Sequence, residues 1–274
     1  MKAKPATAGY CSLAVAVASV GVADLAPVVI GATGGSGTRV VARIARLAGY
    51  DLGTNLNSAE DALEFYSFHD KWINLFVKAE RRGTALSATD SQRMKLEFHA
   101  ALDRHHPSGS PETHWGWKAP RSIYLLPFLL AELPDMKFIH VLRDGRDMAL
   151  SANQVQLRKH GAAVLSWTER MFRSAPERSL LLWSRVNARG AEFGESRLRE
   201  NYLRVRFEDI CIKPLETTAH IINFLNARVD PEPIAKAEIS PPSTLQRWRT
   251  CSPALLAKLE RVGADALRKF GYLA

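Results

Sequence analysis

The chain has 274 residues, of which 46% are hydrophobic and 24% charged, and this composition excludes a disordered or fibrous protein. Its 37 Lys and Arg residues against 28 Asp and Glu residues give a formal net charge of +9, which favours anionic partners. The basic residues form no long run, so no nucleic-acid partner is expected. Cys11, Cys211 and Cys251 have neither the pattern of a disulfide framework nor a metal-ligand spacing. They favour a reducing compartment, and we expect a cytoplasmic location.

The first 26 residues form an extension ahead of the predicted domain. Lys2 and Lys4 precede a weakly apolar run of about a dozen residues and then small residues, a sequence that resembles a signal peptide. The run is too short and too rich in Ala to predict a membrane span, so no stable membrane insertion is expected. A targeting segment and a loosely ordered extension both remain open. Residues 27–274 are predicted to form one domain.

Short apolar runs alternate with helical patterns along this domain. Residues 26–32 ("APVVIGA") are typical of a buried parallel strand that ends in glycine, and a helical pattern follows over 37–48 up to Gly49. Further strands are predicted over 112–122, 136–144 and 201–210, and further helices over 58–82, 84–105, 123–133, 163–194, 214–226 and 253–270. The alternation predicts a three-layer α/β/α fold with a small, mostly parallel sheet of four to five strands and helix-rich insertions.

Two groups of ring side chains are interpreted as structural. Aromatic residues recur at helical spacing at Phe65, Tyr66, Phe68, Trp72 and Phe76, and two more lie at Trp115 and Trp117. Such residues are typical of a core, and lining a pocket is the alternative. His105 and His106 have no companion ligands in the sequence. We therefore expect them in a surface loop rather than at a metal site.

The glycines that follow the first predicted strand indicate a phosphate site, because a strand–glycine–helix junction presents backbone N–H groups. Residues 31–37 satisfy the dinucleotide-binding spacing G-x-x-G-x-x-G. A dinucleotide fold next requires a strand that ends in an acid or Arg about 20 residues on, and residues 49–66 have little strand character. No Tyr is followed by Lys four positions later, so the Tyr-x-x-x-Lys pair of reductases is absent.

A nucleotide-triphosphate site of the Walker A kind requires Gly-Lys-Ser/Thr, whereas residues 36–38 contain no Lys, so ordinary ATP hydrolysis is not expected. A second candidate phosphate site follows the strand predicted over 136–144. Arg143 ends this strand, and Ser151 lies eight residues later, two turns along the helix expected to follow. An Arg and a hydroxyl so placed can bind one phosphate together, although a surface Arg and a helix Ser are the simpler interpretation.

The whole stretch 137–151 ("KFIHVLRDGRDMALS") closely resembles the 3′-phosphate motif of sulfotransferases that use 3′-phosphoadenosine 5′-phosphosulfate (PAPS). The glycine loop resembles the 5′-phosphosulfate loop of that family. Three further stretches resemble its Lys-x-Pro segment, its Tyr-Glu-Asp strand and its C-terminal basic loop: 115–122 ("WGWKAPRS"), 202–210 ("YLRVRFEDI") and 245–253 ("LQRWRTCSP"). The combination favours this family over a reductase, because several separate motifs agree.

The resemblance implies a P-loop-like fold that moves a sulfonate group from PAPS to a hydroxyl or amine, without a metal, and leaves 3′-phosphoadenosine 5′-phosphate (PAP). Short connections favour a small-molecule acceptor. The implied donor-binding residues are Gly34, Gly35, Ser36, Gly37 and Thr38 at the 5′ end, Arg143 and Ser151 at the 3′-phosphate, Phe207 at the adenine, and Arg247, Trp248 and Arg249 in the closing loop. An NAD(P)-binding reductase-like protein or a non-catalytic nucleotide-binding relative is the alternative.

The chain departs from the family pattern at Gly35, where the family has a Lys or Arg that reaches the bridging oxygen and the sulfonate. Two residues are candidates to replace that charge, Lys118 and Arg39. Lys118 is the better one, because it lies in the segment that resembles Lys-x-Pro. The alternatives are a surface Lys beside a turn and an Arg that faces solvent.

Attack by an acceptor releases a proton, so a base is required. Acidic and His residues beyond the first predicted helix are the candidates: Glu60, Asp61, Glu64 and His69. Asp61 stands first, because it resembles an acidic position of bacterial sulfotransferases. Its alternative role is structural, since Ser58 and Asp61 also have the spacing of a helix capping box.

Overall fold

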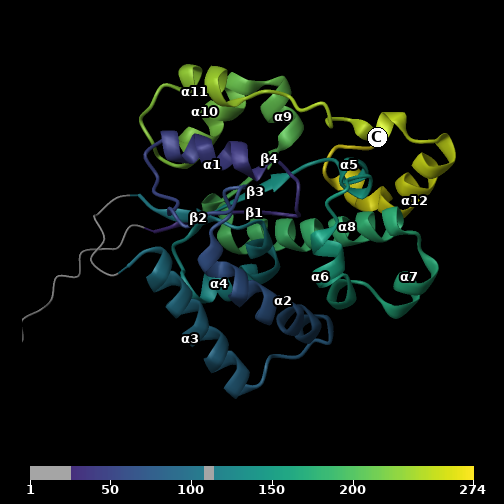
Figure 1. The fold of residues 1–274 in the computed structure, drawn as a ribbon, viewed down its shortest axis with the longest axis horizontal. Helices are drawn as coiled ribbons and strands as arrows, with labels where there is room; N and C mark the ends of the chain where they lie inside the picture. Colours follow the sequence, from purple (N-terminus) through teal and green to yellow (C-terminus); the bar gives the residue numbers. More distant parts are fainter. Residues whose placement is uncertain (1–25, 108–113) are drawn as a thin grey trace, which may run out of the picture.

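The computed structural model describes residues 26–107 and 114–274, so nearly all of the predicted N-terminal extension lies outside the described residues. Four parallel strands form the sheet, in the order β2-β1-β3-β4 (Figure 1). Their bounds are β1 Val28–Ala32, β2 Gly116–Lys118, β3 Lys137–Leu142 and β4 Tyr202–Arg206. The prediction of a small, mostly parallel sheet in a helix-rich α/β fold is confirmed.

Side chains of β1 alternate between two buried faces of the sheet. Val28 and Ile30 pack in the core cluster that contains α1, whereas Val29 packs in the cluster that contains Trp117. All five residues of β1 are buried, since helices cover both sides. A strand covered on both faces has to be apolar throughout, and this explains why an uninterrupted apolar run predicted it.

Helices cover the two faces in separate groups (Figure 1). One face carries α1 Thr38–Leu47, α9 Phe207–Ile212, α10 Pro214–Phe224 and α11 Pro231–Glu238. The other carries α2 Tyr66–Arg81, α3 Ala88–His105, α4 Leu126–Glu132 and α8 Ala175–Phe193, with the 3₁₀ segments η1 Leu63–Phe65 and η2 Pro120–Leu125.

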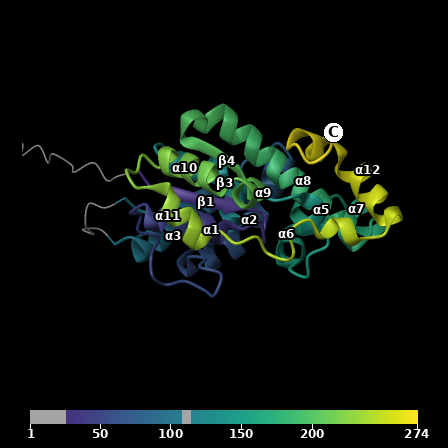
Figure 2. The ribbon, with the colours of Figure 1, turned by 90° about the horizontal axis from the view of Figure 1, so that it is seen from above.

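The remaining elements gather toward one end of the molecule in both views (Figure 2). They are α5 Gly145–Ala149, α6 Val155–Val164, α7 Trp167–Phe172 and α12 Pro253–Lys269, with the 3₁₀ segment η5 Arg247–Thr250. A π-helical turn, η3 Gly194–Leu198, and the 3₁₀ segment η4 Arg199–Asn201 connect α8 to β4. Within the described ranges, no helix is long and apolar enough to cross a bilayer.

Helix boundaries differ from prediction where local side-chain bonds compete with the helix. The helix expected over 58–82 begins only at Leu63, because the Asn57 side chain accepts hydrogen bonds from the backbone N–H groups of Ala59 (2.8 Å) and Asp61 (2.9 Å). These bonds, with Glu60 at φ 66°, fold the segment into a turn. The capping-box interpretation of Ser58 and Asp61 is therefore wrong.

The helical region predicted over 163–194 is divided, since Ser166 and Ser174 each begin a new helix with a capping box. The short helix α11 was not predicted. The helix begins with Pro-Glu-Pro, and Pro disfavours a helix except in its first turn. The local sequence therefore gives little indication of a helix here.

The interpretation of His105 and His106 as a surface loop is wrong. His105 ends α3 with its side chain buried, and its Nε2 lies 2.8 Å from the carbonyl oxygen of Gly116. The His106 ring stacks on Trp115 with 4.2 Å between ring centroids. Both rings therefore join α3 to the edge strand β2. Among the described residues, no group of three His, Cys, Asp or Glu side chains is placed to hold a metal ion.

The predicted core aromatics Phe65, Phe68 and Trp72 are buried, and Trp117 packs with them in the same cluster. This confirms the core interpretation for these four side chains. Tyr66 is an exception, because its hydroxyl faces a polar cluster rather than the core.

Burial of His140 in β3 predicts sensitivity to mild acid. The ring is fully buried, its Nε2 lies 2.9 Å from Asn187 Oδ1, and burial lowers its pKa to about 4. An unfolded His titrates near pH 6.5, so between pH 6.5 and pH 4 the unfolded chain binds a proton that the native protein does not. We expect the free energy of unfolding to fall by roughly 3 kcal/mol across this window through His140 alone.

Urea unfolding between pH 7 and pH 4 measures this slope. His140→Gln should reduce it, whereas His220→Gln, on the exposed side of α10, serves as the matched control. An unchanged slope in His140→Gln would contradict the assignment.

Candidate active site

A cleft of about 570 Å³ opens at the carboxyl ends of β1 and β2. Ligands of open α/β sheets bind at this edge, and the volume is in the range of small-molecule sites. Eight of the predicted site residues line it: Gly34, Gly35, Gly37, Thr38, Arg39, Asp61, Lys118 and Phe207. The structure thus brings the glycine loop together with the two candidate cations, Lys118 and Arg39, and with the proposed base Asp61.

The glycine loop runs from β1 into α1 with two residues in the left-handed region, Gly35 at φ 83° and Gly37 at φ 85°. A Cβ at Gly37 would lie 2.1 Å from the Phe207 ring, so glycine is required there for packing as well as for conformation. The conformation at Gly35 likewise disfavours the Lys or Arg that the family pattern has at this position.

The first turn of α1 is open to an anion. Helix α1 has no side-chain N-cap, and within the described part of the chain the N–H groups of residues 34–38 donate to no protein acceptor. Ser36 is buried and its hydroxyl donates to the carbonyl oxygen of Thr33 at 2.7 Å, which holds the loop in shape. Several free N–H groups at a helix N-terminus suit a phosphate group.

Asp61 and Lys118 form a buried ion pair in the cleft floor, although 57 residues separate them in the chain. Asp61 Oδ1 accepts a short hydrogen bond from Lys118 Nζ, and Asp61 Oδ2 accepts from the Tyr66 hydroxyl at 2.9 Å and from Asn57 Nδ2 at 3.3 Å. Lys118 Nζ also donates to the carbonyl oxygen of Ala59 at 2.6 Å. Only 2% of the Lys118 side chain is exposed, so the alternative of a surface Lys is wrong.

Burial and the charges around Asp61 and Lys118 shift the pKa values of groups in the cleft. Burial lowers the pKa of Lys118, although the Asp61 carboxylate opposes the shift, and the Arg39 guanidinium lowers it further. Burial and the nearby Asp61 raise the pKa of the Tyr66 phenol to about 12, so Tyr66 remains a donor at neutral pH. Arg39 is exposed and has no hydrogen-bond partner within the described ranges, which leaves its charge available in the cleft.

The other base candidates differ in position. Glu60 lies in the same turn as Asp61, but its carboxylate accepts from Arg43 and Arg46 at 2.8 Å each. Glu64 lies 3.3 Å from buried His105. His69 lines the cleft, and burial together with the charge of Arg121 lowers its pKa well below 6.5, so its imidazole is neutral.

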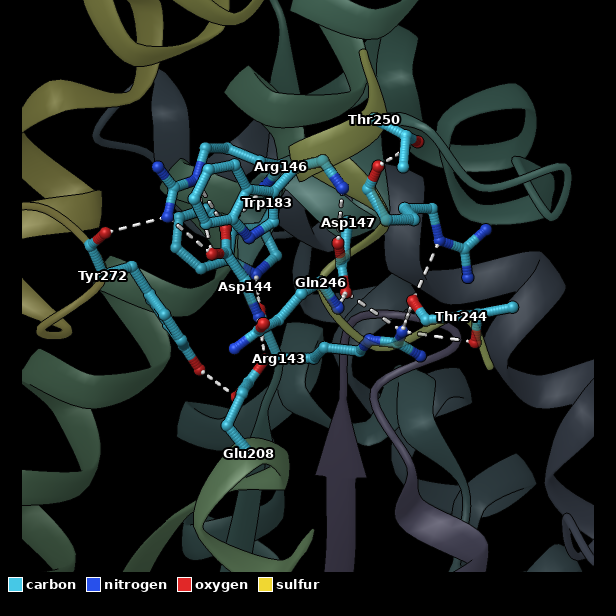
Figure 3. A network of polar contacts seen from close by, with 12 residues as sticks. Arg143, Asp144, Arg146, Asp147, Trp183, Glu208, Thr244, Gln246, Thr250 and Tyr272 are labelled. Atoms are coloured by element: carbon cyan, nitrogen blue, oxygen red, sulfur yellow. Dashed lines mark hydrogen bonds and ion pairs between the residues drawn. The ribbon is translucent and has the colours of Figure 1, made fainter. Parts of the chain in front are cut away.

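The predicted 3′-phosphate residue Arg143 lies beyond the cleft, in a buried network (Figure 3). Its Nη2 donates to Asp147 Oδ2 at 3.0 Å and, in a short bond, to the carbonyl oxygen of Thr244. Asp147 also accepts from the backbone N–H groups of Gln246 (2.8 Å) and Trp248 (3.1 Å). Residues 244–248 are therefore held directly against the end of β3.

Arg143 Nε is buried and has no partner among the residues that the structure describes. The guanidinium carbon lies 5.4 Å from the centroid of Phe207, the residue predicted at the adenine. A buried N–H without a partner is costly, and an anion bound there would remove that cost.

Ser151 does not lie two turns along a helix, as the spacing predicted, because α5 ends at Ala149. Gln154 Nε2 donates to the carbonyl oxygens of Met148 (3.0 Å) and Ser151 (2.8 Å) and so satisfies the end of the helix. The Ser151 hydroxyl accepts from the backbone N–H of Asn153 at 3.2 Å. Ser151, like Arg143, does not line the cleft.

The predicted closing loop is η5. The Arg146 guanidinium carbon lies 3.8 Å from the centroid of the Trp248 ring, and the exposed Arg249 lies 5.4 Å from the same centroid. Arg247 Nε donates to the carbonyl oxygen of Thr244 at 3.3 Å. These three residues order the loop beside Arg143 and do not line the cleft.

Sequence reasoning missed three groups of the cleft: Asn57, Arg121 and Lys159. Arg121 follows Lys118 at a spacing of three, so the Lys-Ala-Pro-Arg string was a usable signal for it. Lys159, on α6, has no such signal, because only the packing of α6 on α2 brings it to the cleft.

The parallel sheet, the glycine loop and the cleft at the strand ends define a P-loop-like α/β protein with a cleft at the edge where such sheets bind ligands. The model of the Sulfotransferase family matches residues 27–231, most of the chain, and the protein therefore belongs to this family. No curated protein sequence matches the chain.

Solved sulfotransferase structures resemble the fold. The sulfotransferase domain of the Synechococcus PCC 7002 olefin synthase shares 15% identity at a TM-score of 0.53, covering 91% of this chain and 95% of that one. The sulfotransferase of Alicyclobacillus acidocaldarius shares 15% identity at a TM-score of 0.51, covering 89% and 93%. The sulfotransferase domain of the curacin biosynthetic pathway shares 15% identity at a TM-score of 0.50, covering 91% and 99%. At identities this low, the structural similarity shows a common fold and nothing further.

Proposed function

We propose that the protein transfers a sulfonate group from PAPS to a hydroxyl or amine of a small-molecule acceptor. The observation that carries the proposal is the buried Asp61–Lys118 pair in one cleft with an uncapped glycine loop. A base and a cation therefore face an anion site, and sulfonate transfer requires all three.

The donor has phosphates at two ends, and the chain offers two fitting sites. The free N–H groups of residues 34–38 fit the 5′ end, and the unpartnered Nε of Arg143 fits the 3′-phosphate, with Phe207 between them. When bound, PAPS supplies an activated sulfonate on a phosphate leaving group. The chain supplies fixed N–H donors and charges that need no rearrangement.

The proposed roles in the cleft follow from the contacts. Asp61, held by three donors, takes the acceptor proton. Lys118 and Arg39 stabilise the negative charge on the 5′-phosphate, in place of the basic side chain that Gly35 lacks. The cleft volume of about 570 Å³ supports a small acceptor rather than a polymer.

Nucleotide binding tests the proposal first. PAP at about 100 times its dissociation constant should stabilise the protein by roughly 2.7 kcal/mol, measured as a shift in thermal unfolding. NADPH is the matched comparison, and stabilisation by NADPH alone would favour the reductase-like alternative instead. Transfer is then measured with PAPS and an acceptor library as a product mass gain of about 80 Da. PAP binding without any product would favour a non-catalytic relative.

Arg143→Ala tests the 3′ site. We expect this variant to weaken binding of PAPS far more than binding of adenosine 5′-phosphosulfate, which lacks the 3′-phosphate. The loss of a charge-assisted pair corresponds to about 1.5–3 kcal/mol, or roughly 10- to 100-fold in the ratio of dissociation constants. Calorimetric titration measures the dissociation constants of both nucleotides. Damage to the Asp147 network would weaken both of them, so their ratio reports the loss at the 3′-phosphate alone. Equal losses for the two nucleotides would remove Arg143 from the site.

A further inference from the structure

The end of the cleft beyond Asp61 is basic. Arg121, at the start of η2, and Lys159, on α6, line this end together with His69. Both cations contact one carboxylate, Asp70 on α2. Lys159 Nζ lies 2.7 Å from each Asp70 oxygen, and Arg121 Nη1 donates to Asp70 Oδ1 in a short bond.

One carboxylate does not balance two cations, so this end of the cleft has an excess positive charge. Partial burial raises the pKa of Asp70, but the hydrogen bonds from Lys159 and Arg121 outweigh burial and lower it overall, so Asp70 carries its full negative charge at neutral pH. The neighbouring His69 is neutral. The group Arg121, Lys159 and Asp70 therefore retains one net positive charge.

Arg121 has donors to spare and a fixed orientation. Among the described residues only its Nη1 has a hydrogen-bond partner, although a guanidinium carries five N–H donors. Its side chain is only 10% exposed, and its guanidinium carbon lies 5.0 Å from the centroid of the Tyr66 ring. Tyr66 also donates to Asp61, so one aromatic residue holds both the proposed base and this Arg.

We infer that the acceptor is a hydroxyl compound that carries an oxyanion, such as a carboxylate, and that Arg121 and Lys159 bind this oxyanion while Asp61 faces the reacting hydroxyl. A planar guanidinium with free N–H donors pairs well with a carboxylate or sulfate group. The oxyanion would complete the hydrogen bonds of Arg121 and balance the excess charge. This inference rests on the proposed function, because it takes the end beyond Asp61 as the acceptor side.

Matched acceptors test the inference with saturating PAPS. One pair is 4-nitrophenyl glucuronide and 4-nitrophenyl glucoside, which differ by a carboxylate in place of a hydroxymethyl group. A second pair is 4-hydroxybenzoate and 4-hydroxybenzyl alcohol. We expect kcat/KM to favour the anionic member by at least about tenfold. Equal or reversed preference within both pairs would overturn the inference.

Variants assign the preference to the two cations. Arg121→Gln with Lys159→Gln should bring the anionic and neutral members within about twofold of each other, while PAP binding is retained. Arg121→Lys should keep part of the preference, because it keeps the charge. Arg158→Gln is the matched control, since Arg158 is exposed on the same helix and does not line the cleft. A preference that survives in the double variant would overturn the assignment.

Binding measurements separate this inference from the proposed function. If PAP binds but neither pair is sulfated, calorimetry of the PAP complex with the glucuronide and with 4-hydroxybenzoate decides. Binding that the double variant loses supports the anion site, and equal or absent binding in both proteins overturns it. If PAP does not bind, the proposed function fails, and the same titration on the protein alone tests the anion site by itself.

Discussion

Asp61→Asn should bind PAP normally and lose at least about a hundredfold in kcat. The substitution keeps the size of the side chain and one acceptor oxygen, but it removes the carboxylate that we propose takes the proton of the acceptor substrate. Asp61 faces the cleft from a rigid position, because Lys118, Tyr66 and Asn57 all donate to it. Initial rates at saturating PAPS and acceptor, together with a PAP titration, measure the two effects separately.

Glu60→Gln is the matched control for this experiment. Glu60 is one residue away, but its carboxylate points to Arg43 and Arg46 rather than to the cleft. We expect turnover to be unchanged in this variant. If Asp61→Asn also turned over at a normal rate, Asp61 would be a structural residue of the turn, and His69 would become the base to test.

Lys118→Met should lower kcat by about a hundredfold and change the KM for PAPS much less. Removal of one donor that stabilises developing negative charge costs on the order of 10²–10³ in kcat. The charge on the leaving phosphate grows only as the bond to sulfur breaks, so its stabilisation acts on kcat rather than on ground-state binding. Met preserves the length of the buried side chain, which limits the cavity that Ala would leave.

Lys137→Met controls for the loss of a partly buried Lys, since Lys137 lies at the amino end of β3 and donates to the carbonyl oxygen of Phe224 at 2.7 Å. It should leave kcat unchanged. A rise in KM for PAPS without a change in kcat would assign Lys118 to donor binding alone. The double variant Lys118→Met with Asp61→Asn tests whether the two residues act together. If it is no less active than Lys118→Met alone, the two residues act as one unit.

The fold was largely predictable because its signals are local. Strands β1 and β3 are buried on both faces, and a doubly covered strand must be a continuous apolar run. The glycine loop was predictable for the same reason, since a backbone with positive φ at Gly35 and Gly37 requires glycine at those positions. The helix starts at Leu63 and Ala175 were not, because the Asn57 side chain folds the residues before Leu63 into a turn and a capping box at Ser174 begins the later helix.

The candidate site depends on contacts between segments far apart in the chain. Asp61 and Lys118 could be named from the sequence, and their roles stay predictions, but only the packing of the 57–62 turn against β2 makes them an ion pair. Arg143 was placed from its motif. Its hydrogen bond to the carbonyl oxygen of Thr244, 101 residues away, had no signal in the local sequence. Ser151 was misplaced because α5 ends at Ala149, before Ser151 is reached.

The sequence by itself determined the layers, the glycine loop and the residue types available for chemistry, because backbone conformation and burial act over a few neighbouring residues. Only the tertiary structure decided the charge of the proposed acceptor end, since Asp70, Arg121 and Lys159 come from three separate elements. Electrostatic interactions depend on distance in space, and 89 residues separate Asp70 from Lys159 in the chain. No pattern along the sequence indicates that Arg121 and Lys159 line one cleft and share the Asp70 carboxylate.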